Sequence, residues 1–94
     1  MTGKERAELR SQAHVLEPIV HIGKEGVTEN VVRQADDALT ARELIKCTVQ
    51  QNAPLDAKEA SAVLCGKTGA EPISVTGRRF VIYRYSPQKH EHRE

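Results

Sequence analysis

Apolar residues recur along this chain with two different periods, which separates the expected helices from the expected strands. Near the start, Leu9 and Ala13 repeat at helical spacing, and Thr2 with Glu5 fits a capping box. The pattern therefore predicts a first helix over about residues 3–14.

Two further segments carry helical patterns with recognisable ends. Thr28 is suited to the N-cap position, and the amphipathic pattern that follows predicts a helix over residues 28–42. Asp56 with Glu59 forms a second candidate capping box, and Gly69 stands where a glycine commonly ends a helix. A third helix is predicted between them.

Four short segments are predicted to be strands: residues 19–22, 44–49, 72–76 and 79–85, the last two joined by a Gly77-Arg78 turn. The second of these is aliphatic, is interrupted only by Lys46, and is expected at the centre of the sheet. Right-handed crossovers would make the first three strands parallel and the last antiparallel. The predicted fold is an α/β, two-layer αβαβαββ domain with a mixed four-stranded sheet.

The chain of 94 residues is short enough for one domain only, which we place at residues 1–86. From Ser86 the apolar pattern is lost, and residues 87–94 are expected to form a disordered tail. With 14 basic and 13 acidic residues the formal net charge is +1, so the global field is too weak to attract nucleic acid. Any anion site must be local.

The sequence offers no catalytic, metal or cofactor site. Cys47 and Cys65 lack metal-ligand spacing and are expected to be buried free thiols in a reducing cytosol. No apolar segment approaches transmembrane length and the start is polar, so we expect a cytoplasmic protein.

The most informative stretch is the G-x-x-G loop of Gly23, Lys24, Glu25 and Gly26 between a strand and the helix that Thr28 opens. Glycines let a backbone approach another molecule closely, and the start of a helix attracts anions. Lys24 adds a cation, while Glu25 opposes it. The loop is either a phosphate site or an ordinary βα turn.

A second candidate is the basic stripe of the first helix. Arg6, Arg10 and His14 fall on the shoulder of its apolar face, where they could point along the protein surface. The alternative is a solvated face in which Glu5 and Glu8 serve as salt partners.

Several motifs in order resemble the YhbY-like CRM family, the chloroplast RNA splicing and ribosome maturation domain, in its free-standing bacterial form. They are Leu16-Glu17-Pro18-Ile19-Val20-His21-Ile22-Gly23-Lys24-Glu25-Gly26-Val27-Thr28-Glu29, Ala38-Leu39, Glu43-Leu44-Ile45-Lys46, and Gly77 with Val81-Ile82-Tyr83-Arg84. The resemblance implies a fold similar to the C-terminal domain of translation initiation factor 3. Family members are commonly more basic, and Glu17 and Glu25 depart from that pattern.

The resemblance also implies a function: binding of structured RNA backbone, without catalysis, during assembly of the large ribosomal subunit. The expected partner is a ribosomal RNA precursor or a precursor particle, bound by a monomer that needs no cofactor. The RNA contacts implied by the resemblance are Gly23, Lys24, Gly26, Arg6, Arg10 and, more weakly, His14.

Two other functions stay open at this point. One is a protein-binding assembly factor, which the near-neutral charge makes reasonable. The other is a small nucleotide-binding enzyme, which is disfavoured because the sequence has no linked nucleophile and base and no complete phosphate-binding loop.

Overall fold

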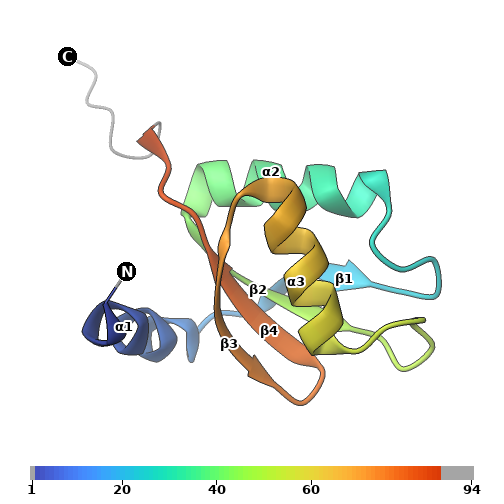
Figure 1. Cartoon of the computed structure of the whole chain (residues 1–94), viewed down its shortest axis with the longest axis horizontal. Coiled ribbons are helices and arrows are strands. Elements are labelled where there is room, and N and C mark those ends of the chain that lie inside the picture. The colour runs from blue at the N-terminus through green and yellow to red at the C-terminus, as the bar shows by residue number, and fades with distance from the viewer. Residues whose placement is uncertain (1, 88–94) are drawn as a thin grey trace.

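A computed structural model describes residues 2–87 and contains the predicted elements in the predicted order (Figure 1). The helices are α1 (Gly3–Ala13), α2 (Glu29–Arg42) and α3 (Ala57–Thr68), and the strands are β1 (Pro18–Ile22), β2 (Leu44–Val49), β3 (Glu71–Thr76) and β4 (Arg79–Tyr83). The predicted bounds agree with these to within a residue or two.

The helices begin and end where the local sequence signals indicate. Thr2 and Asp56 both complete capping boxes, and the Thr28 hydroxyl accepts a hydrogen bond from the Val31 amide. Gly69 ends α3 in the left-handed conformation, with φ of 76°. These three N-caps and one C-cap are confirmed.

The sheet has the strand order β1-β2-β4-β3. β1 and β2 are parallel, whereas β4 is antiparallel to both β2 and β3. The first three strands therefore run in one direction and the last in the other, as predicted. The order itself places β4 between β2 and β3, so the final strand of the domain lies inside the sheet rather than at its edge.

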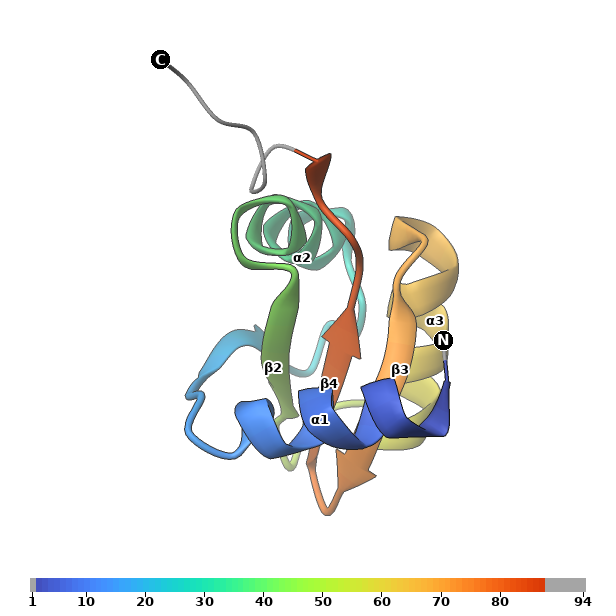
Figure 2. The ribbon, with the colours of Figure 1, turned by 90° about the vertical axis from the view of Figure 1, so that its left-hand side faces the viewer.

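Both faces of the sheet bear helices, so the domain has three layers where two were expected. α2 and α3 cover one face, where Ile45, Phe80 and Ile82 lie in the larger apolar cluster. α1 crosses the other face (Figure 2) and packs with Leu44 and Val81 in a smaller cluster. The physical reason is that β2 and β4 carry apolar side chains on both faces, and the second set also needs cover.

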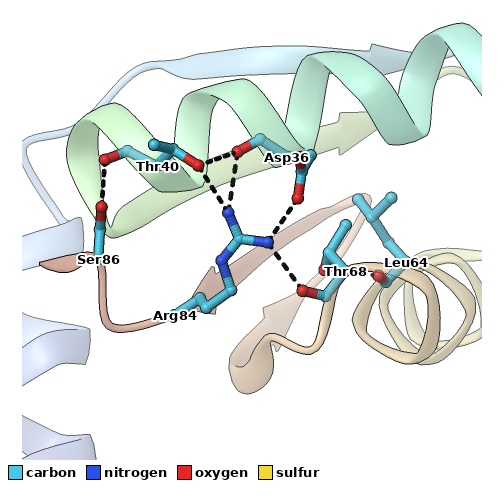
Figure 3. Close-up of polar contacts among 6 residues, drawn as sticks. All are labelled: Asp36, Thr40, Leu64, Thr68, Arg84 and Ser86. Atoms are coloured by element: carbon cyan, nitrogen blue, oxygen red, sulfur yellow. Dashed lines mark hydrogen bonds and ion pairs between the residues drawn. The ribbon is translucent and has the colours of Figure 1, made fainter. Parts of the chain in front are cut away.

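Arg84, just after β4, fastens α2 to the end of α3 (Figure 3). Its Nη1 donates to Asp36 Oδ1 at 2.6 Å and to the Thr68 carbonyl at 2.8 Å. Its Nη2 donates to the Asp36 carbonyl at 3.0 Å and to Thr40 Oγ1 at 2.9 Å. One planar guanidinium thus satisfies a terminal carbonyl of α3 and two turns of α2, which suits arginine and not lysine.

The chain stays packed as far as Ser86, which is buried against the end of α2. Its amide donates to Glu43 Oε2 at 2.8 Å, and its hydroxyl donates to the Thr40 carbonyl at 2.5 Å. Glu43 itself is buried and has a positive φ of 69° at the turn from α2 to β2. Residues 88–94 of the predicted tail lie outside the described residues.

Cys47 and Cys65 are buried free thiols, as predicted. Burial raises the pKa of Cys47 to about 12, and the neighbouring Cys65 adds to the shift. Across residues 2–87, no helix has the length and hydropathy needed to traverse a membrane.

Candidate nucleic-acid interface

The G-x-x-G loop is a compact turn closed by its own hydrogen bonds. The Gly26 amide donates to the Gly23 carbonyl at 2.9 Å, and the Thr28 amide donates to the Gly26 carbonyl at 3.1 Å. The turn leads directly into α2, whose first amides have no acceptor within the helix. The predicted link between the glycine loop and a helix N-terminus is therefore present. The Gly26 amide, however, already donates a hydrogen bond within the turn.

The two glycines have different roles in this turn. Gly26 is buried with φ of 75°, and a Cβ placed there would come within 3.3 Å of Pro54 Cγ. Its close approach is therefore to the loop between β2 and α3. Gly23 has no left-handed φ, and a Cβ there would lie 3.1 Å from Gln50 Oε1. Contact of either glycine with RNA stays a prediction.

The hollow beside this loop contains charges of both signs. Lys24 and Arg33 line it together with Glu25 and Glu29. Because the two cations are matched by two carboxylates, the local field is weaker than the G-x-x-G motif suggests. The acidic character noted for Glu25 in the sequence is thus reinforced by a second residue at the helix start.

The basic stripe of α1 lies as predicted on one shoulder of its buried side, with Leu9 and Ala13 packed below it. Arg10 and His14 are exposed, but Arg6 is half-buried, and its Nε is enclosed without a hydrogen-bond partner in residues 2–87. Arg6 is therefore not a fully solvated surface residue.

A groove of about 360 Å³ runs between the α1 stripe and the part of the sheet that α1 leaves open. Three cations and one histidine line it: Arg10 from α1, His14 at the C-cap of α1, Lys46 from β2 and Arg79 from β4. The other lining residues are Ala13, Ser74, Thr76 and Val81, so the part of the chain that the structure describes places no carboxylate in the groove. Its volume is at the lower end for ligand clefts.

Strand register explains how these sheet residues come to share a face. Arg79 pairs with Thr48 on one side and with Thr76 on the other, and His21 pairs with Thr48. Paired residues point to the same side of a sheet, so this row crosses all four strands without an acidic residue. Lys46 lies two residues from Thr48 on the same side.

Tyr83, at the end of β4, belongs to the smaller apolar cluster beneath α1. Burial raises the pKa of Tyr83, which packs beneath α1, and the negative charge of Glu43 adds to the shift, with smaller effects from Glu5 and Glu71.

The structure does not bring the loop and the α1 stripe together. In Figure 1, α1 lies at one end of the longest axis and the loop between β1 and α2 at the other. Arg10 and His14 of the stripe instead share the groove with Lys46 and Arg79, which were not predicted from the sequence. A signal was available for Lys46: the one charged residue of an aliphatic strand must point where a face of the sheet is open.

Comparison with known proteins identifies the family. The model of the family described as "CRS1 / YhbY (CRM) domain" matches residues 1–84 of this chain. The chain belongs to this family.

Three similar proteins show how much of the chain the similarity covers. The chain is 39% identical to "Probable RNA-binding protein YqeI" of Bacillus subtilis, over 94% of this chain and 92% of that protein. It is 32% identical to an "RNA-binding protein" of Haemophilus influenzae, over 94% and 89%. It resembles the solution structure of hypothetical protein SAV1595 from Staphylococcus aureus, with 48% identity, a TM-score of 0.78, and coverage of 92% and 90%.

Proposed function

We propose that this protein binds structured RNA through its phosphate backbone, without catalysing a reaction, and assists assembly of the large ribosomal subunit. The observation that carries the RNA part is the groove beside α1, where Arg10, His14, Lys46 and Arg79 gather and no lining residue within 2–87 is a carboxylate. Relatives that the chain matches over 92% and 89% of their length are named as RNA-binding proteins, which supports this part. The ribosomal part rests on the family resemblance.

In this proposal the predicted residues act as separate contacts on one long RNA footprint. Arg6, Arg10 and His14 hold backbone at α1, while Lys24 and the amides near Gly23 and Gly26 contact phosphate at the far end. Because backbone contacts carry no sequence information, the protein recognises RNA shape. It acts in the cytoplasm as a monomer, with a ribosomal RNA precursor or a precursor particle as partner.

The test of RNA binding is its dependence on salt. If roughly three to five phosphates are neutralised, the slope of log K against log salt should be about −2 to −4. The measurement is fluorescence anisotropy of a labelled RNA hairpin at several salt concentrations. Affinity that does not change between low and physiological salt would remove the proposed phosphate contacts.

The ribosomal role is tested separately by sedimentation. The tagged protein should travel with precursors of the large subunit in a sucrose gradient and should leave that fraction after RNase treatment. The net charge of only +1 favours a second candidate, an assembly factor that binds protein. Copurification of a protein partner that survives RNase would support this second function.

A further inference from the structure

We propose that the groove beside α1 is the principal phosphate-binding site of this protein, and that Lys46 and Arg79 are its main contacts with the RNA backbone. This inference deepens the proposed function and rests on it. It assigns the leading role to the sheet face and a lesser one to the G-x-x-G loop.

The first reason is the balance of charge at the two places. The groove is lined by Arg10, His14, Lys46 and Arg79, and none of its lining residues between Thr2 and Pro87 is acidic. At the loop, Lys24 and its neighbouring cation are offset by two carboxylates. An RNA strand is a continuous row of negative charges, so the groove attracts it and the G-x-x-G loop exerts little net attraction.

The second reason is how firmly the cations are held. Lys46 lies in β2, where it pairs with Pro18 on one side and Val81 on the other. Arg79 opens β4 and pairs with Thr48 and Thr76. Both strands are interior to the sheet, so both backbones are fixed before RNA arrives. Lys24 lies instead at the exposed tip of a turn.

The third reason concerns the chemistry of the surrounding residues. Ser74 and Thr76 bring hydroxyl groups to the groove, and these can hydrogen-bond phosphate or sugar oxygens. No aromatic ring offers a base-stacking surface there: Phe80 packs on the other face, Tyr83 lies under α1, and Tyr85 follows the end of β4. The ligand class is therefore RNA backbone rather than unstacked bases.

The experiment compares three double variants that each remove two positive charges. Lys46→Gln with Arg79→Gln alters the groove, and Lys24→Gln with Arg33→Gln alters the loop. Lys58→Gln with Lys67→Gln alters exposed positions of α3, on the opposite face of the sheet, and controls for net charge. Binding of a labelled RNA hairpin and of labelled poly(U) is measured for each variant over a range of salt.

The groove variant should lose roughly 15- to 30-fold in affinity at 0.15 M salt, and its log–log slope should be less steep by about 1.4 to 1.8, as expected for two phosphate contacts. The loop variant should lose less than about fivefold, the worth of one such contact, and the α3 variant still less. A charge-conserving variant, Lys46→Arg with Arg79→Lys, should bind as the parent does.

Three results would overturn the inference. If the groove variant loses no more than the α3 variant, or if the loop variant loses more than the groove variant, the inference is wrong while RNA binding stands. If the parent binds neither RNA even at low salt, the proposed function falls as well. Melting curves show whether each variant folds. Should the groove pair unfold, Arg79→Gln alone at an exposed position decides, with an expected loss of roughly four- to fivefold.

Discussion

Replacement of Gly26 by alanine tests whether the G-x-x-G motif is required by the fold itself. Gly26 has φ of 75° and is enclosed by the loop between β2 and α3. Gly69 supplies a matched control, because its φ is 76° and nothing lies within 4 Å of the Cβ position. Gly23 supplies a second control without a left-handed φ.

The expected costs follow from these geometries. Left-handed backbone costs a residue with Cβ roughly 1–2 kcal/mol, so Gly69→Ala should destabilise by about 1 kcal/mol once the stiffer unfolded chain is allowed for. Gly26→Ala has the same backbone cost and also places Cβ 3.3 Å from Pro54 Cγ, a ring atom that cannot swing away. A total of about 2 kcal/mol is expected. For Gly23→Ala we expect under about 0.5 kcal/mol, because the nearby Gln50 side chain is flexible.

Urea denaturation followed by circular dichroism gives the free energy of unfolding of all three variants, and thermal melts give their melting temperatures. Each 1 kcal/mol should lower the melting temperature by about 4–8 °C in a domain of this size. Equal losses for Gly26→Ala and Gly69→Ala would show that the contact with Pro54 contributes nothing. A Gly26→Ala variant as stable as the parent would refute the reasoning altogether, and the motif would then have to be explained by ligand binding.

Three other outcomes follow from the structure. Arg84→Ala should lower the free energy of unfolding by about 2–3 kcal/mol in urea titrations, chiefly through the lost bond to the Thr68 carbonyl, and Arg84→Lys should not restore the stability. A loss below about 0.5 kcal/mol would show that Arg84 does not hold α2 to α3. Burial raises the pKa of Cys47 from 9.0 to about 12, so the unfolded chain releases this proton at a lower pH than the folded protein does. The free energy of unfolding should therefore fall as pH rises from 9.0 to about 12, and it should fall less steeply in Cys47→Ala. Glu25→Lys should strengthen binding of an RNA hairpin roughly fourfold at low salt without changing the melting curve; unchanged affinity would show that RNA does not reach the loop.

The elements of the fold could be predicted because their signals are local. Thr28, Asp56 and Gly69 each mark a helix end through contacts within a few residues of themselves. Strand order and layering depend on contacts between distant segments, and the apolar residues on both sides of β2 fit either two layers or three. That α1 covers Leu44 could not be deduced, because the apolar pattern of the α1 sequence is weak.

The candidate site was predictable to the same degree. Arg10 and His14 were found because helical spacing places them on one shoulder of α1. Their neighbours in the groove were not found, because Lys46 and Arg79 meet them only through the register of β2 with β4. The glycines of the loop were expected to allow a close approach, but the sequence could not show that Pro54 is what approaches Gly26.

The interior position of β4 constrains when the domain can acquire its structure. β3 has β4 as its sheet neighbour, and β2 has β4 along one side, so neither can complete its pairing until Arg79–Tyr83 exists. A chain growing on the ribosome therefore holds β2 and β3 as unsatisfied edges until the final strand emerges, and then closes them together. Synthesis interrupted before Arg79 leaves two strands open to pairing with other chains, which makes such fragments targets for proteolysis or aggregation.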